Sequence, residues 1–284
     1  MRPDVQSFFH PPTGTVTYLV SDPATRMAAV IDPVLDYEQS AARLSSNSAD
    51  AVLAAADDAG LEIAWILETH AHADHLSAAD YLRRKRGAKL GIGARIVDVQ
   101  KTFGRIFSAS DVRPEAFDAL FQDGDTFPLG ELTVKVLHTP GHTPACVSYL
   151  IGDALFVGDT LFMPDFGTAR TDFPGGDATM LYRSIRRLLD LPPQTRVFVG
   201  HDYLPAGRAE HAWETTIAAE KAHNVQVHEG IAEADFVARR RARDATLAPP
   251  ALILPALQVN IRAGALPPAD ADGTVFLKLP LNMI

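Results

Sequence analysis

The segment THAHADH, residues 69–75, constrains the fold most, because it places three histidines and one aspartate within six positions. A packed core would have to hydrogen-bond each of these nitrogen and oxygen atoms, and a solvated loop has no need of them. The segment directly follows LEIAWILET (61–69), an apolar run that predicts a buried strand. We therefore expect a strand to hold this cluster at the edge of a sheet.

Three further junctions place a ligand-type residue where a predicted strand meets a loop: TPGHTP (139–144), VGDT (157–160) and VGHD (199–202). Side chains at strand ends are held by a stiff sheet, while the adjoining loops leave room for a substrate. The four junctions together contribute seven candidate metal ligands: His70, His72, Asp74, His75, His142, Asp159 and His201.

Imidazole and carboxylate groups without thiolates suit zinc, iron or manganese, and they argue against a closed structural zinc site. His70 and His72 can face one centre, and Asp74 and His75 can face a neighbouring one. Seven groups exceed the four ligands that a closed zinc site needs. Two interpretations stay open: two metal ions, or one ion with further groups that orient its ligands.

Composition excludes several classes of partner. The formal charge is 26 − 35 = −9, and no basic tract is long enough to follow a phosphate backbone, so we expect no nucleic acid. The densest basic run, RRKR (83–86) before Gly87, is typical of a helix C-terminus. No stretch approaches the ~18 apolar residues of a membrane span, and the first residues lack a signal-peptide pattern. A single cysteine, Cys146, excludes an internal disulfide, and we expect a reducing, cytoplasmic setting.

The chain alternates predicted strands and helices in two halves, which favours the α/β class and a sandwich. We expect a hairpin from 15–22 and 26–34, and strands at 61–69, 88–93, 131–140, 145–153, 154–162 and 195–203. Helices are expected at 39–60, 76–86, 178–191, 208–223 and 231–244, and the proline-rich stretch 249–264 is expected to be extended.

The HxHxDH pattern at 70–75, with its three partner junctions, resembles the metallo-β-lactamase superfamily. The resemblance covers nearly the whole chain and implies one domain, 1–284, folded as an αβ/βα sandwich with its metal site at one edge. Position 75 is His where many true β-lactamases of this fold carry Arg, and position 72 is His where flavodiiron proteins carry Glu.

Within the superfamily the sequence is more similar to persulfide dioxygenases, which are related to glyoxalase II. The stretches that carry this similarity are 15–36, 68–78, 138–153 and GTARTDFPGGDA (167–178). Compared with the mitochondrial type, the segment of about 94–122 is interpreted as an insertion. The segment of about 225–284 is interpreted as a C-terminal extension packed on the domain.

The resemblance implies one Fe(II) per chain, bound by the catalytic residues His70, His142 and Asp159. The implied reaction oxidises the outer sulfur of glutathione persulfide with O2 to sulfite and releases glutathione, as in hydrogen sulfide detoxification. Residues that would orient these ligands, or hold a second metal, are His72, Asp74, His75 and His201. A homodimer is left open.

Substrate binding is expected from Arg170, Thr143 and Tyr203. Arg170 can grip a carboxylate with two hydrogen bonds, but an internal ion pair to Asp172 or Asp165 is equally compatible with the sequence. Arg262 is a weaker candidate. His138 is expected to be structural, and Cys146 an inert buried thiol.

Two other functions remain as main alternatives, and a lactonase or another hydrolase of the same fold is a weaker option. The first is a thioester hydrolase of the glyoxalase II type, in which two Zn(II) ions bridged by Asp159 would activate a water molecule. The second is a binding module with a vestigial site. The module is disfavoured because loss of function erodes ligands, and none of the seven is missing.

Overall fold

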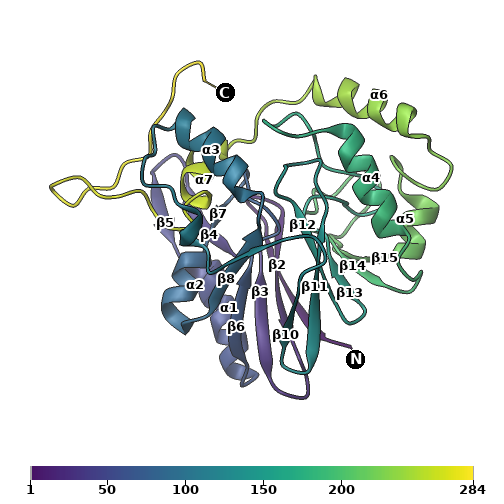
Figure 1. Ribbon diagram of the computed structural model, residues 1–284, viewed down its shortest axis with the longest axis horizontal. Coiled ribbons are helices and arrows are strands. Elements are labelled where there is room, and N and C mark those ends of the chain that lie inside the picture. The colour runs from purple at the N-terminus through teal and green to yellow at the C-terminus, as the bar shows by residue number, and fades with distance from the viewer. Residues whose placement is uncertain (1, 284) are drawn as a thin grey trace.

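The computed structural model describes residues 2–283 and forms a sandwich of two six-stranded β-sheets with helices on both outer faces (Figure 1). The first sheet has the order β1 (Asp4–His10), β2 (Thr15–Ser21), β3 (Met27–Ile31), β6 (Glu62–Leu67), β8 (Lys89–Gly93) and β9 (Ala119–Phe121). The second has the order β10 (Thr126–Leu129), β11 (Leu132–His138), β12 (Val147–Ile151), β13 (Ala154–Phe156), β14 (Arg196–Phe198) and β15 (Glu214–Thr216). A small third sheet consists of β5 (Arg43–Ser45), β4 (Val34–Glu38) and β7 (Leu76–Ser77).

Seven α-helices and one short 3-10 helix complete the described residues. They are α1 (Asn47–Asp58), α2 (Ala79–Arg86), α3 (Ile96–Ile106), the 3-10 turn η1 (Pro114–Ala116), α4 (Ala178–Leu189), α5 (Ile217–His223), α6 (Glu233–Asp244) and α7 (Ile253–Asn260). In Figure 1, α1 and α2 lie outside the first sheet, and α4 and α5 lie outside the second. The expected αβ/βα sandwich is confirmed.

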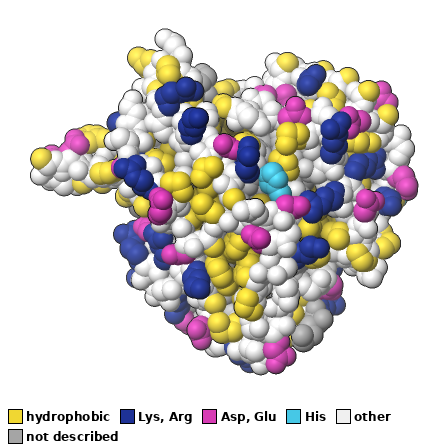
Figure 2. Space-filling view, in the orientation of Figure 1, with side chains coloured by type: hydrophobic (Ala, Val, Ile, Leu, Met, Phe, Trp, Pro, Cys, Tyr) yellow, Lys and Arg dark blue, Asp and Glu magenta, His cyan; other side chains and the backbone are white. Residues whose placement is uncertain are grey.

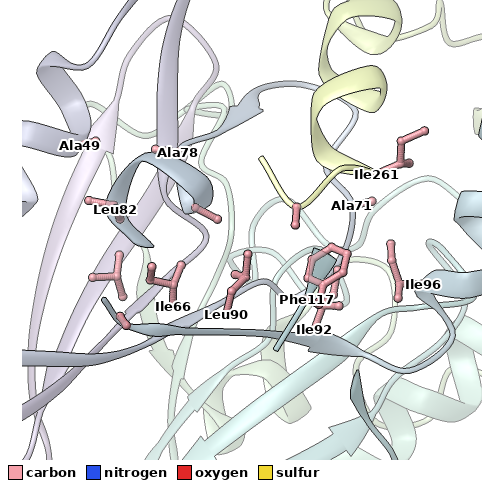
Figure 3. Close-up of a cluster of buried hydrophobic side chains, with 14 of the residues drawn as sticks. Ala49, Ile66, Ala71, Ala78, Leu82, Leu90, Ile92, Ile96, Phe117 and Ile261 are labelled. Carbon is pink, nitrogen blue, oxygen red and sulfur yellow. The ribbon is translucent and has the colours of Figure 1, made fainter. Parts of the chain in front are cut away.

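The strand β3 illustrates why the sheets pack in this way. Its residues Ala28 and Val30 face the helices, whereas Ala29 and Ile31 face the opposite sheet. Side chains alternate between the two faces of a strand, so a strand that is apolar at every position is buried on both sides. Figure 3 shows the helix-side cluster, in which Ile66 of β6 and Leu90 of β8 pack against Leu82 of α2.

Two buried tyrosines in the core between the sheets hold the strand-to-loop junctions that the sequence singles out. The hydroxyl of Tyr18 donates a hydrogen bond of 2.6 Å to the carbonyl of Val199, and that of Tyr149 donates one of 2.9 Å to the carbonyl of Glu68. A buried tyrosine hydroxyl needs such a partner. The packing of the core therefore fixes the positions of the two strand ends that precede His70 and His201.

Several expected elements are confirmed, including the hairpin of β2 and β3, the helices α4 and α6, and the helix end at RRKR. Gly87 closes α2 with a φ of 68° and donates its N–H to the carbonyl of Arg83. This is the left-handed cap that glycine adopts without steric cost.

Three expectations about secondary structure are wrong. The helix expected at 39–60 begins only at Asn47, because the preceding residues form β5 and pair with β4. The helix expected at 208–223 begins at Ile217, after β15. The stretch 249–264 is not extended but contains α7, in which Pro255 occupies the first turn, where its missing N–H has no helical partner to lose.

The two segments interpreted as additions both pack on the sandwich. The segment 94–122 supplies α3 and the edge strand β9, which pairs in parallel with β8. In the C-terminal segment, α6 packs on α4, and α7 packs on β7 and α3. Whether either segment is an addition relative to relatives stays a prediction. The helix α7 contacts the histidine-rich segment directly, because Asn260 donates to the carbonyls of His72 and His75 at 2.8 Å each.

The surface carries charges of both signs, and the helices are short. On the face drawn in Figure 2, basic and acidic side chains are interspersed among apolar ones. No helix within residues 2–283 is both long enough and apolar enough to cross a lipid bilayer.

Candidate metal centre

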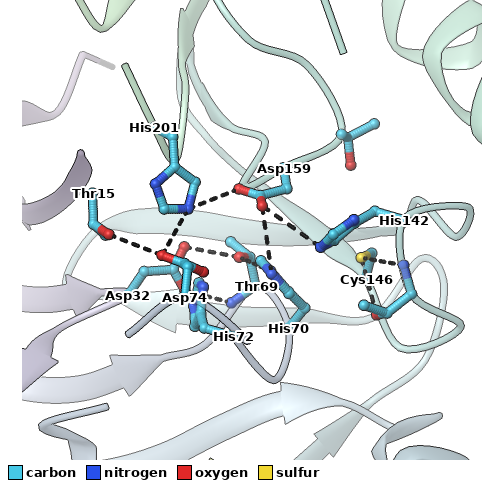
Figure 4. A network of polar contacts seen from close by, with 12 residues as sticks. Thr15, Asp32, Thr69, His70, His72, Asp74, His142, Cys146, Asp159 and His201 are labelled. Atoms are coloured by element: carbon cyan, nitrogen blue, oxygen red, sulfur yellow. Dashed lines mark hydrogen bonds and ion pairs between the residues drawn. The ribbon is translucent and has the colours of Figure 1, made fainter. Parts of the chain in front are cut away.

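Three candidate ligands from three different junctions converge at one point of the structure. One side-chain atom each of His70, His142 and Asp159 lies within 4.8 Å of the others, and all three residues are buried. Oδ2 of Asp159 lies 3.8 Å from Nε2 of His70 and 3.6 Å from Nε2 of His142 (Figure 4). The structure therefore brings together the two histidines and the carboxylate named as iron ligands from the sequence.

Hydrogen bonds behind the two histidines fix which ring nitrogen faces the centre. Nδ1 of His142 donates to the carbonyl of Arg170 at 2.8 Å. The hydroxyl of Thr69 donates to Oδ2 of Asp32 at 2.8 Å, so it accepts from Nδ1 of His70 at 3.0 Å. In both rings Nε2 is thus left with a lone pair directed at Asp159, which is the state that binds a metal.

Burial favours the uncharged form of two of the motif histidines. It lowers the pKa of His70 well below its usual value, and the nearby His72 and His142 add to this effect. It lowers the pKa of His75 to about 4. An uncharged imidazole is the form that ligates metals, so these two side chains can accept a metal ion near neutral pH without first losing a proton.

A second group of candidate ligands adjoins the first. His72, Asp74 and His75 each offer one atom within 4.8 Å of the others. His201 lies between the groups, with its Nε2 3.3 Å from Oδ1 of Asp159 and 3.4 Å from Oδ2 of Asp74. Asp159 thus turns Oδ2 to the first group and Oδ1 to the side of His201, so the geometry accommodates either one metal ion or two.

Two buried carboxylates that the sequence reasoning missed lie behind His72. Nε2 of His72 lies 3.0 Å from Oδ1 of Asp32 and 3.2 Å from Oε2 of Glu68. Burial lowers the pKa of His72, but Asp32 and Glu68 outweigh it and raise this pKa well above the usual value. Burial also raises the pKa of Glu68. Asp32 ends the strand run AAVID (28–32), so the strand-end signal that identified the other ligands was present there too.

The donor set fits a metal ion on a structural criterion. Within residues 2–283, buried side-chain atoms without a hydrogen-bond partner gather at this centre: Nε2 of His70, Nε2 of His75, Oδ1 of Asp159 and both ring nitrogens of His201. Buried polar atoms are otherwise almost always hydrogen-bonded. Unpaired imidazole and carboxylate atoms facing one another are the donors that iron and zinc prefer.

Two glycines allow the loops that carry Asp159 and His142 to pack closely against neighbouring segments. Gly158 has a φ of +51°, and a Cβ built on it would lie 2.4 Å from Oγ1 of Thr69. Gly141 has a φ of +143°, and its Cβ would lie 2.3 Å from the Cα of Leu181. A side chain at either position would clash with Thr69 or Leu181, and the positive φ angles add strain for any residue other than glycine.

The centre opens into a cavity of about 180 Å³. Apolar and aromatic side chains form most of its wall, with arginines toward the C-terminal segment. The residues concerned are Ala73, Phe162, Phe166, Ala169, Phe173, Tyr203, Leu247 and Pro250, together with Arg170, Arg240 and Arg243. Asp74, His142 and Asp159 also line this cavity, so a molecule bound in it reaches both ligand groups.

Of the three residues expected to bind substrate, Tyr203 and Arg170 line the cavity and Thr143 does not. Tyr203 lines the cavity and stacks on His201 with ring centroids 5.3 Å apart. Thr143 faces Cys146 instead, with its Oγ1 3.1 Å from the sulfur. Arg170 lines the cavity, but its Nε and Nη2 each lie 2.6 Å from an oxygen of Asp172, which is the internal ion pair that the sequence allowed.

The remaining residues considered from the sequence lie apart from the centre. Arg262 pairs with Asp111 at 2.6 Å, and His138 contacts the carbonyl of Pro144 at 2.9 Å. Burial raises the pKa of Cys146 to about 12, so its thiol stays protonated. None of these three side chains lines the cavity within the described residues.

Comparison with known proteins agrees with the fold. A family model described as the metallo-β-lactamase superfamily matches residues 10–201. A probable metallo-hydrolase of Burkholderia pseudomallei is 49% identical, with 99% of both chains covered. A protein named glyoxylase B2 of Dictyostelium discoideum is 46% identical over 96% of this chain and 94% of its own length.

Proteins named for persulfide oxidation also match. The human mitochondrial persulfide dioxygenase ETHE1 is 30% identical over 70% of this chain and 68% of its own length. The crystal structure of ETHE1 from Myxococcus xanthus matches with a TM-score of 0.74 and 33% identity, covering 92% of this chain and all of that one. A beta-lactamase hydrolase-like protein of Agrobacterium fabrum is 50% identical over 99% of this chain, which spans only 65% of that protein's length.

Proposed function

The chain belongs to the metallo-β-lactamase superfamily, and we propose that within it the chain is a persulfide dioxygenase, because it is similar to proteins of that name. Such an enzyme converts glutathione persulfide and O2 to sulfite and glutathione. The balanced reaction consumes one O2 and one water for each sulfite and glutathione formed, and it releases two protons. We place the enzyme in the cytoplasm, in keeping with its single cysteine.

The observation that carries this proposal is the group of His70, His142 and Asp159 beside an open cavity. Two histidines and one carboxylate are the ligand set of non-haem Fe(II) oxygenases, in which the remaining positions admit substrate and O2. The similarity to the persulfide dioxygenases named above supports iron as the metal.

Fe(II) held by these three residues would supply the activation of O2 and an acceptor for the persulfide sulfur. The protein itself positions and encloses the reactants. Phe162, Phe166 and Phe173 line the cavity with apolar surface that limits access of water to the ligand group. Tyr203 also lines the cavity, and a phenol is protonated near neutral pH, so it can donate a hydrogen bond to a substrate.

A thioester hydrolase with two metal ions remains the second candidate. The observation in its favour is the pair of adjoining ligand groups, with Asp159 offering one oxygen to each side. In such an enzyme a water bound between two metals is activated for attack on a carbonyl carbon. The name of the Dictyostelium relative points in the same direction.

We expect anaerobically iron-loaded protein to consume O2 when it is given glutathione persulfide, with one sulfite formed for each O2 consumed. The measurement combines an oxygen electrode with sulfite detection, and a parallel sample receives S-lactoylglutathione. Thioester hydrolysis without oxygen uptake would refute the dioxygenase and favour the hydrolase. Protein loaded with Zn(II) instead of iron serves as the control, because zinc cannot undergo the redox changes needed to activate O2.

A further inference from the structure

Three arginines line the cavity beside the ligand group, and two of them already have carboxylate partners. Besides its two contacts with Asp172, Arg170 donates from Nη1 to the carbonyl of Ala248 at 2.7 Å. Its guanidinium carbon also lies 5.2 Å from the ring centroid of Phe173. Each of its three nitrogens therefore already donates a hydrogen bond within the protein, and Asp172 cancels its charge.

Arg240 is buried and holds α6 onto the loop that precedes Asp172. Its Nε donates to Oδ1 of Asp244 at 2.9 Å, and its Nη1 donates to the carbonyl of Thr168 at 3.2 Å. Oδ2 of Asp244 accepts in turn from the backbone N–H of Thr171 at 2.9 Å. Arg240 and Asp244 thus form a neutral buried pair with a structural task.

Arg243, one turn further along α6, is the remaining arginine of the cavity wall. It is exposed, and no side-chain hydrogen bond or ion pair joins it to any residue in the range 2–283. The helix carries two other exposed arginines, Arg239 and Arg241, but neither lines the cavity. After the pairs Arg170–Asp172 and Arg240–Asp244 cancel, Arg243 supplies the positive charge at the rim.

We propose that Arg243 binds a carboxylate of the substrate and so selects anionic, carboxylate-bearing thiols. The proposal rests on the proposed function, in which the substrate is a persulfide of glutathione. A cavity of about 180 Å³ is smaller than the range of about 300–1,000 Å³ typical of sites that enclose a drug-sized ligand. It holds the sulfur-bearing end of a tripeptide, and the remainder lies across the rim, where a free guanidinium grips a carboxylate with two hydrogen bonds.

Anaerobic calorimetry on the metal-loaded protein tests the proposal without relying on turnover. The probes are reduced glutathione and its diethyl ester, in which both carboxylates are uncharged. We expect Arg243→Gln to raise the Kd for glutathione about tenfold and to leave the Kd for the diester unchanged. Arg241→Gln, on the same helix but outside the cavity wall, is the matched control and should change neither value. Arg243→Lys should retain part of the affinity, since it keeps the charge but loses the planar fork.

The outcomes separate this proposal from the proposed reaction. Equal binding of glutathione by the wild type and Arg243→Gln overturns the role of Arg243, whatever the reaction is. Absence of binding by the wild type overturns it as well. Binding that depends on Arg243, in a protein that consumes no O2 with the persulfide, keeps the carboxylate site and refutes the dioxygenase. In an active enzyme the same variant should raise KM for glutathione persulfide and leave kcat unchanged.

Discussion

His142→Ala should remove bound iron and catalytic activity together. The substitution deletes one of the three converging ligand atoms, and its imidazole is already oriented for binding by the hydrogen bond from Nδ1 to the carbonyl of Arg170. Loss of even a group that only orients a ligand lowers metal affinity by about 10–100-fold, so loss of a ligand should lower it by at least ~100-fold. Metal analysis after gel filtration, alongside oxygen uptake, measures both effects.

His138→Ala is the matched control for this variant. His138 lies four residues earlier on the same junction, but its Nε2 contacts the carbonyl of Pro144 and it belongs to neither ligand group. This control should keep its iron. Full iron content in a folded His142→Ala protein would refute the assignment of His142 as a ligand, and circular dichroism establishes that each variant is folded.

Asp32→Ala should cause the largest loss of stability of any single substitution at the centre. Asp32 is 2% exposed and accepts from the N–H of Thr69 at 2.7 Å and from its hydroxyl at 2.8 Å, while Nε2 of His72 lies 3.0 Å away. Removing one partner of a buried charged network costs about 3–5 kcal/mol. Its φ of 50°, which aspartate tolerates better than alanine, adds to the loss.

The measurement is the free energy of unfolding in urea of the metal-free protein, so that metal affinity does not contribute. Asp36→Ala is a close match as a control, since Asp36 accepts from the N–H and the hydroxyl of Ser48 at 2.9 and 2.7 Å. Asp36 also faces a histidine, with Nε2 of His10 at 3.4 Å, but its side chain is 22% exposed, so water can replace it. We expect a loss of about 1 kcal/mol there. Equal losses in the two variants would show that the buried network around Asp32 contributes no more to the free energy of unfolding than the partly exposed contacts of Asp36.

The sequence sufficed to locate the seven candidate ligands because each of them follows a recognisable strand. The strands β6, β13 and β14 are short and rich in apolar residues, and β11 alternates buried and exposed positions. A ligand-type residue follows each of them. Strand ends on the same edge of a sandwich meet in space, so convergence of these residues follows from the fold class alone. Whether they hold one ion or two does not follow, because Asp159 faces both sides in the folded chain.

The groups that the sequence did not reveal act through contacts between distant positions. Asp32 reaches Thr69 across 37 residues, and Asn260 reaches His72 across 188. No local pattern encodes such pairings. The helix α7 was missed because its proline suggests an extended chain, although a proline in the first turn leaves the helix intact.

Arg170 illustrates a different limit. The sequence allowed either a substrate contact or an internal ion pair for Arg170. A side chain two residues away favours the ion pair, since Asp172 accepts from Nε and Nη2 of the guanidinium. Among the residues that the structure describes, the cavity-lining arginine without a carboxylate partner lies instead on α6, in a run of four arginines within residues 239–243 that the sequence presents as an ordinary solvated helix face. Only the folded structure distinguishes Arg243, which lines the cavity and is exposed, from Arg240, which lines it but is buried and paired with Asp244, and from Arg239 and Arg241, which do not line it.

Anomalous diffraction at the iron edge from anaerobically iron-loaded crystals tests most directly whether this protein carries a mononuclear iron centre. We expect a single peak enclosed by His70, His142 and Asp159, with coordination positions left open toward the cavity. Two peaks, with Asp159 between them and His72, Asp74 and His75 around the second, would contradict it.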